Sequence, residues 1–146
     1  MKEEVILSIL PHKLREVFKR ENIDFQSIQE IRLRVGKPLI LLYKGSEVIP
    51  KVDGQIYHIT NEEIREMLDY ISGYSLYSYE REMSQGYITI EGGHRVGLSG
   101  QAIMENGKVK NLKYISSINV RMSHEILGCA DGLLPYITFH RRLYHT

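Results

Sequence analysis

Two turn signals in the second half of the chain constrain the fold more than any other feature. In "GYITIEGGHRVGLSG", Gly92 and Gly93 separate two runs that carry alternating apolar residues, and Asn106-Gly107 follows the second run. Paired glycines and Asn-Gly favour the tight turns that join antiparallel strands. With "YISSINVRMS" as a returning strand, this segment predicts an antiparallel sheet.

The first half of the chain predicts a smaller antiparallel meander between helices. In "IQEIRLRVGKPLILLYKGSEVI", "GKP" and "KGS" supply the turns. The first strand is expected to alternate between an apolar face and a charged face, made by Ile31, Leu33 and Val35 and by Glu30, Arg32 and Arg34.

Helical periodicity predicts helices over residues 3–10 and 12–21 and a second pair after the meander. In "HITNEEIREMLDYISG", Thr60 and Glu63 form a capping box and Gly73 is the expected stop. A further helix is expected over residues 76–84. The order of helices, small sheet, helices and larger sheet indicates an α+β fold rather than alternating βαβ units.

Composition describes one soluble domain. The chain has 146 residues, of which 42% are apolar and 25% charged, and it contains a single cysteine, so no internal disulfide can form. A net charge of +1 gives no overall attraction to nucleic acid or anionic lipid, so such binding would need a local patch. Without a signal peptide or membrane-spanning run, a cytoplasmic location is expected.

The glycine spacing raises the question of a nucleotide-binding loop. Gly92 and Gly97 have the separation found in a P-loop and Ser99 matches its hydroxyl residue, but Leu98 stands where the lysine is required. We therefore expect no P-loop, no catalytic residue and no cofactor in this chain.

No metal site is expected either. His124-Glu125 begins like H-E-x-x-H, but Gly128 occupies the second histidine position, so a solvent-exposed His-Glu pair is the better interpretation. Cys129 has no CxxC partner and is expected to be a buried small residue.

Two groups of residues admit a binding role. The tyrosines of "YISGYSLYSY" are either a stacking platform for single-stranded nucleic acid or, as we favour, rings buried between helices. Arg32, Arg34 and Lys37 form either a solvated face or a surface for an anion or partner. A small single-stranded nucleic-acid-binding module is thus the alternative function, although the near-neutral charge argues against a nucleic-acid partner.

Several collinear segments closely resemble the N-terminal region of the stage III sporulation protein AA family of endospore-forming bacteria. They cover the chain to about Ile137, and they are "ILSILPHKLREVF", "IQEIRLRVGKPLIL", "LDYISGYSLYSYERE", "QGYITIEGGHRVGLSGQAI" and "ISSINVRMSHEILGCADGLLPYI". More distantly, "EIRLRVGKP", "EEIREMLDYI" and the glycine-arginine hairpin resemble the N-domains of type II and type IV secretion ATPases.

The resemblance implies a division of labour between domains. It implies a non-catalytic regulatory and assembly domain over residues 1–137, before an ATPase core that binds ATP and magnesium in a hexameric ring. The family is thought to act on the mother-cell side of a channel complex between mother cell and forespore, so other stage III sporulation channel proteins are implied partners. The resemblance implies a glycine-rich P-loop soon after "LLPYI", but "TFHRRLYHT", residues 138–146, stands there instead. We therefore expect a deliberately shortened chain, the product of a disrupted reading frame or a stand-alone domain.

The resemblance also implies roles for two arginines. Arg95, just after the glycine turn, and Arg121, on the returning strand, match positions whose arginines approach the nucleotide in related ATPases. Gly97 and Gly100 would then allow another surface to approach closely. The alternative, which the sequence leaves open, is that both arginines pair with acids such as Glu91 or Glu125 at the surface, worth at most about 1 kcal/mol.

Overall fold

The computed structural model describes residues 2–139 and 142–143 and confirms the α+β fold. The helices are α1 (Lys2–Ile9), α2 (His12–Arg20), α3 (Asn61–Tyr74), α4 (Tyr79–Gln85) and α5 (Leu134–Ile137), with a 3-10 helix at Phe25–Ser27. The strands are β1 (Ile28–Arg34), β2 (Ile40–Tyr43), β3 (Ser46–Val48), β4 (Lys51–Val52), β5 (Gln55–Ile56), β6 (Tyr87–Thr89), β7 (Arg95–Glu105), β8 (Lys108–Arg121), β9 (Thr138–Phe139) and β10 (Arg142–Leu143).

The meander and the later strands belong to one six-stranded antiparallel sheet in the order β3-β2-β1-β8-β7-β6. The link between them is the pairing of β1 with β8, which sets Ile31 opposite Val120 and Leu33 opposite Ile118. All four of these side chains are buried. Burial of two apolar strand faces against the same helices therefore explains why the two parts fuse into one sheet.

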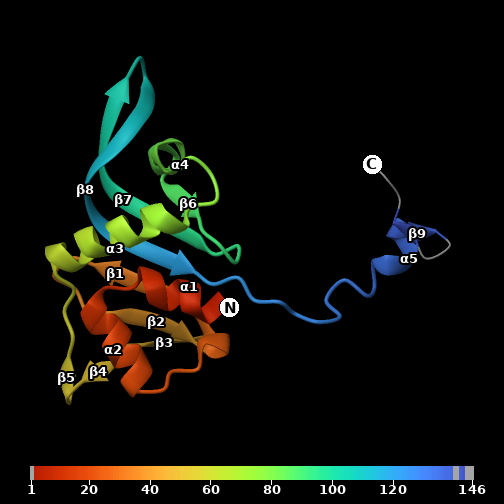
Figure 1. The fold of residues 1–146 in the computed structure, drawn as a ribbon, viewed down its shortest axis with the longest axis horizontal. Helices are drawn as coiled ribbons and strands as arrows, with labels where there is room; N and C mark the ends of the chain where they lie inside the picture. The colour runs from red at the N-terminus through yellow and green to blue at the C-terminus, as the bar shows by residue number, and fades with distance from the viewer. Residues whose placement is uncertain (1, 140–141, 144–146) are drawn as a thin grey trace.

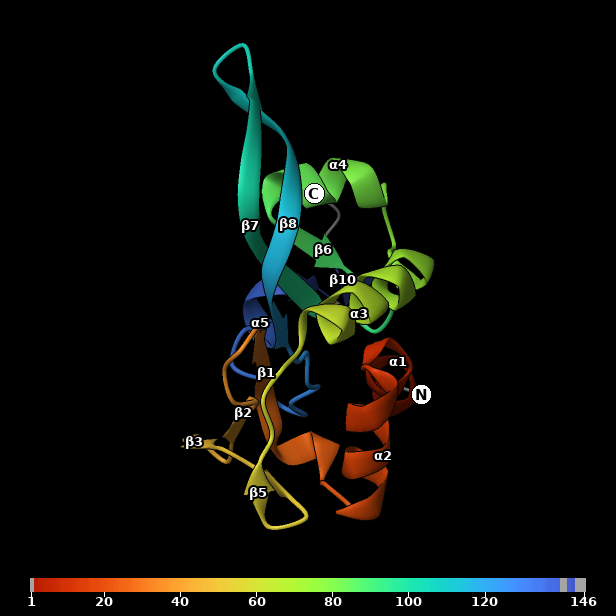
Figure 2. The same cartoon turned by 90° about the vertical axis from the view of Figure 1, so that its left-hand side faces the viewer.

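Helices α1 to α4 lie on one side of this sheet, and no helix among the described residues covers the other side (Figures 1 and 2). The core lies between the layers and is built from aliphatic side chains of α1, α2, α3 and the sheet, with Phe18 and Phe25 in ring contact at 5.7 Å between centroids. We call the helix-free side of the sheet the open face. It is the surface on which alternation places the polar side chains of the strands.

The helices follow their expected bounds to within one residue, except at the start of α4. The capping box of α3 is confirmed, with Glu63 N–H donating to Thr60 Oγ1 and Thr60 N–H donating to Glu63 Oε2. Gly73 does not end this helix, which continues to Tyr74. Helix α4 begins at Tyr79 instead of residue 76, because the Ser78 hydroxyl caps it by accepting from Arg81 N–H.

Beyond the other strands, β7 and β8 continue as a two-stranded arm that projects from the body (Figures 1 and 2). The predicted turn at its tip is confirmed, since Asn106 and Gly107 both have positive φ, 53° and 74°. At its base the ladder is irregular: Ser99 pairs with Ser117 but Gln101 pairs with Lys113. The strand β8 therefore carries extra residues there, and the bulge redirects the arm.

After Arg121 the chain leaves the sheet and extends to α5 and the β9–β10 pair, apart from the body (Figure 1). Cys129 lies on this segment and is exposed, so the prediction that it is buried was wrong. Cys129 lies in a run of turn residues that precedes α5. Residues 140–141 and 144–146 of the predicted 138–146 tail lie outside the described residues, and the boundary after Ile137 stays a prediction.

Candidate functional site

The pairing of β7, β8 and β1 brings the two candidate arginines together on the open face. Arg95 lies directly opposite Arg121, and Arg121 lies directly opposite Glu30. The flanking residues Val96 and Val120 point to the core and are buried, whereas both arginines are exposed. Like charges directly opposite each other destabilise a sheet, and Glu30 on the other side of Arg121 offsets part of this repulsion.

Arg95 is held by an aromatic ring and not by an acid. Its guanidinium carbon lies 4.6 Å from the centroid of the Tyr87 ring, which comes from the neighbouring strand β6. Within the described part of the chain, Arg95 and Arg121 form no ion pair with Glu91 or Glu125. Stacking on a ring face orients a guanidinium and leaves its N–H edges available to an anion.

Arg32 is placed differently from the other basic residues. Its Nε donates to Glu30 Oε1 at 2.8 Å, and its Nη1 donates to Glu47 Oε1 at 2.6 Å, so one guanidinium bridges β1 and β3. The pKa of Glu30 is lowered by the hydrogen bond from Arg32 first, then by Asn119 and by the charges of Arg32 and Arg121. Arg32 therefore holds the sheet together and offers less to a partner than its neighbours do.

Arg34 and Lys37 lie at the end of the same face and are both exposed. The turn that joins β1 to β2 keeps them close, because Lys37 N–H donates to the Arg34 carbonyl at 3.0 Å. Val35, which the alternation placed on the apolar face, lies outside β1 and is exposed. The strand ends at Arg34 because the chain turns at Gly36, whose φ is 74°.

The four glycines of the hairpin differ in backbone conformation and in the space around them. Gly92 and Gly93 take positive φ, 90° and 81°, which confirms the predicted turn. A Cβ on Gly97 would lie 3.7 Å from the Asn119 carbonyl, an ordinary contact. A Cβ on Gly100 would lie 2.6 Å from the Lys113 carbonyl, so the close approach at Gly100 is internal to the bulge.

A histidine that the sequence did not single out fixes the segment beyond Arg121. His94 is 1% exposed, and its Nδ1 accepts from Ser123 N–H at 2.9 Å, which requires that nitrogen to be unprotonated. His124 Nε2 donates to the Ile28 carbonyl, and His124 is half-buried, so the prediction of a solvent-exposed His-Glu pair was wrong for the histidine. Nothing in the local sequence could have revealed these contacts, because Ser123 is 29 residues away from His94.

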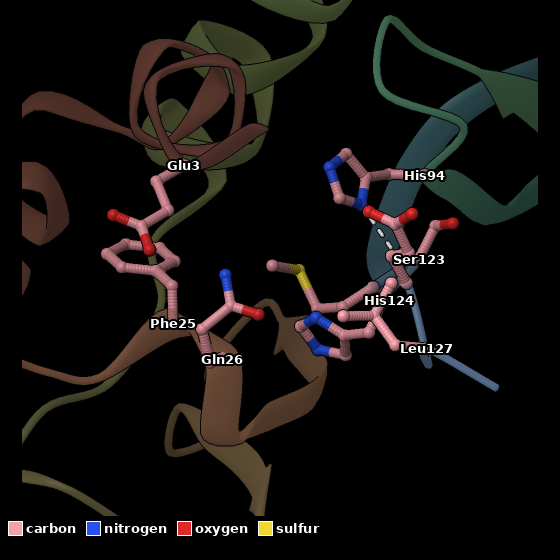
Figure 3. Close-up of a pocket in the computed structure, with 9 residues that line it drawn as sticks. Glu3, Phe25, Gln26, His94, Ser123, His124 and Leu127 are labelled. Atoms are coloured by element: carbon pink, nitrogen blue, oxygen red, sulfur yellow. Dashed lines mark hydrogen bonds between the residues drawn. The ribbon is translucent and has the colours of Figure 1, made fainter. Parts of the chain in front are cut away.

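These residues line a cavity of about 230 Å³ between the sheet and the N-terminal part of the chain. Figure 3 shows His94 and Ser123 on one side of it and Glu3, Phe25 and Gln26 across from them. The arrangement ties the exit of β8 to the glycine turn that carries Arg95. The hydrogen bond between His94 and Ser123 thus links the residue before Arg95 to the segment after Arg121.

The remaining expectations concern tyrosines, metals and membranes. Tyr70, Tyr74 and Tyr79 pack partly buried against the core as favoured, but Tyr77 is 68% exposed. Burial raises the pKa of the Tyr79 hydroxyl.

The described residues contain no cluster of His, Cys, Asp or Glu able to hold a metal ion. None of the helices described in the structure is long and apolar enough to cross a membrane.

Comparison with known proteins shows the family. The sequence profile described as "Sporulation stage III, protein AA" matches residues 1–146. The chain is 39% identical over 134 residues to the stage III sporulation protein AA of Bacillus subtilis (strain 168), which covers 92% of this chain. The chain therefore belongs to the stage III sporulation protein AA family. It spans 41% of the length of that relative.

A solved structure with a similar arrangement is the VirB11 ATPase of the Brucella suis type IV secretion system, crystallised in complex with sulphate. The match covers 90% of this chain and 36% of the other, at 11% identity and a TM-score of 0.42. A likeness at this level carries no argument about the function of the present chain.

Proposed function

We propose that this chain is the non-catalytic regulatory and assembly domain of a sporulation ATPase and presents Arg95 and Arg121 to nucleotide phosphates. The ATP and its magnesium ion would be held by an ATPase core, in the same subunit or the next one of a hexameric ring. On this proposal the assembly works on the mother-cell side of a channel complex and contacts other stage III sporulation proteins.

The observation that supports this most is the arginine pair itself. Two exposed guanidinium groups lie opposite each other on the open face, and Arg95 is oriented by Tyr87 without a carboxylate in ion-pair contact among the described residues. Glu30 lies opposite Arg121, and an anion near Arg95 would remove the like-charge repulsion that remains. A phosphate suits this role because the planar fork of a guanidinium matches two of its oxygens.

The chemical contribution would be electrostatic. Arg95 and Arg121 would donate hydrogen bonds to phosphate oxygens whose negative charge grows as the terminal phosphoryl group transfers, whereas the core would supply the metal and position water. The contact between His94 and Ser123 would keep the hairpin and the exit of β8 in a fixed relation, so that movement of one domain shifts both arginines together.

The test is ATP turnover by a full-length family protein that carries this N-terminal sequence. We expect Arg95→Ala and Arg121→Ala each to lower kcat, by a factor on the order of 10³ if the arginine acts as an arginine finger. Arg81→Ala is the matched control, because Arg81 is an exposed arginine on α4, on the helix side of the sheet. Normal turnover in both hairpin variants would show that the arginines serve the fold alone.

A further inference from the structure

The arm of the β7–β8 hairpin, residues 101–113, has no part in the site described above. Strand β1 pairs with β8 only over residues 117–121, and β6 pairs with β7 only over residues 95–97. The arm therefore stands beyond the paired strands of the rest of the sheet, and its tip lies clear of the helices (Figures 1 and 2). A long free hairpin of this kind is exposed to pairing or docking, and its side chains determine with what.

One face of the arm is apolar along its length. Ala102 lies opposite Leu112, and Met104 lies opposite Val109, so these four side chains share a face. A register shift between Ile103 and Met104 sets Val109, and not Lys110, opposite Met104. The bulge thus keeps this face apolar up to the tip.

This apolar stripe begins at the core and ends in solvent. Leu112 packs against the core, whereas Met104 is 57% exposed and Val109 is 41% exposed. The helices that cover the same side of the sheet do not reach the tip (Figure 2). Neighbouring exposed apolar side chains on a projecting element make this stripe a candidate binding surface.

The arm is also locally basic, although the chain as a whole has a net charge of only +1. Lys108, Lys110 and Lys113 stand on the arm against a single acid, Glu105, which lies 3.3 Å from the Lys110 ammonium. Lys108 and Lys113 are exposed and form no ion pair among the described residues. Lys113 pairs with Gln101 and Lys108 pairs with Glu105, so both lysines lie on the face opposite to the stripe. Their long side chains can extend past the edges of the narrow hairpin toward the partner that contacts the stripe. Such an arm fits a partner that is anionic at its surface and apolar beneath.

We propose that this arm docks on an anionic lipid membrane surface, with Met104 and Val109 entering the boundary between headgroups and acyl chains and the lysines contacting lipid phosphates. Residues 101–113 include no aromatic side chain on which nucleic-acid bases could stack. The stripe is also small beside the roughly 800 Å² that each partner of a standard protein complex buries. A fluid lipid surface needs no such area or shape, and amphipathic basic segments bind it by this combination of charge and burial.

The test is co-sedimentation of the full 146-residue chain with vesicles. Vesicles of phosphatidylcholine mixed with phosphatidylglycerol are compared with vesicles of phosphatidylcholine alone. We expect binding to the anionic vesicles, and loss of about fivefold in affinity for each arm lysine replaced by glutamine. The variant Lys108→Gln, Lys110→Gln, Lys113→Gln is compared with Lys13→Gln, Lys19→Gln, Lys51→Gln, which changes exposed lysines elsewhere and alters the net charge equally.

A second pair of substitutions separates the apolar contact from the charges. Met104→Ser with Val109→Ser leaves every charge in place and is expected to weaken vesicle binding severalfold, since burial of apolar groups adds to electrostatic attraction. We expect each variant to unfold at the wild-type melting temperature, because the substituted positions are exposed. Thermal unfolding therefore checks that the fold is retained.

Three outcomes would overturn the proposal. In the first, the wild-type chain does not sediment with anionic vesicles, which would leave a protein or nucleic-acid ligand for the arm. In the second, the two lysine variants lose binding equally, which would show that net charge alone matters. In the third, binding survives all arm substitutions, and the exposed apolar residues of the segment after β8, such as Leu127 and Tyr136, are responsible.

Discussion

Replacing Gly100 by Ala is expected to destabilise the protein even though its backbone does not have positive φ. A Cβ at this position would lie 2.6 Å from the Lys113 carbonyl oxygen and 3.1 Å from the Ile115 Cα. Both are backbone atoms, so rotation of a side chain cannot relieve the clash and the two strands must move apart. Overpacking of this kind costs about 1–3 kcal/mol. For a domain of this size the melting temperature should fall by roughly 3–10 °C.

Gly97→Ala on the same strand is the matched control. Its Cβ would lie 3.7 Å from the Asn119 carbonyl oxygen, an ordinary contact, so no strain is introduced. Because alanine restricts the unfolded chain more than glycine, this variant should be unchanged or more stable by about 0.4–1 kcal/mol. Thermal unfolding followed by circular dichroism measures both. A Gly100→Ala protein that melts at the wild-type temperature would refute the bulge geometry. An equal loss of stability in both variants would show that the effect is not specific to Gly100.

Two further changes test the local interactions. Thr60→Ala removes the acceptor for Glu63 N–H at the start of α3 and should cost about 1 kcal/mol, measured by urea unfolding; an unchanged midpoint would contradict the capping box. The lowered pKa of Glu30 means that its contact with Arg32 stabilises the fold above the unfolded-state pKa and is lost as pH falls through the folded-state pKa. Glu30→Gln should therefore be less stable than the wild type at pH 7, and the difference should shrink below the ordinary carboxyl pKa of 4.5. A difference that stays constant with pH would contradict this assignment.

The features that the sequence predicted are those that depend on neighbouring residues. The turn at Gly92-Gly93, the tip at Asn106-Gly107 and the box between Thr60 and Glu63 each need residues close in the chain, and all are present. The class of fold followed from the order of such elements. The stop expected at Gly73 failed because Tyr74 packs against the core, and tertiary contact there outweighs the preference of glycine for a helix end.

What could not be predicted depends on partners far away in the chain. The union of the two sheets rests on Arg34 pairing with Ser117 and on the residues beyond them, and no local pattern specifies that β1 lies beside β8. Glycine is needed at position 100 because the extra residues of β8 at the bulge bring the Lys113 carbonyl close to it, and no local sequence pattern indicates that contact. The sequence identified Arg95 and Arg121 through a resemblance, but only the register shows that they lie opposite each other.

The most direct test of the proposed phosphate contact is a paired measurement on Arg95→Lys in a full-length family protein: ATP turnover and melting temperature on the same sample. Lysine keeps the charge and loses the planar fork, and an exposed cation adds little to stability. We predict that kcat falls nearly as far as in Arg95→Ala while the melting temperature stays at the wild-type value. Normal turnover with a lowered melting temperature would contradict the account and would leave Arg95 as a structural partner of Tyr87.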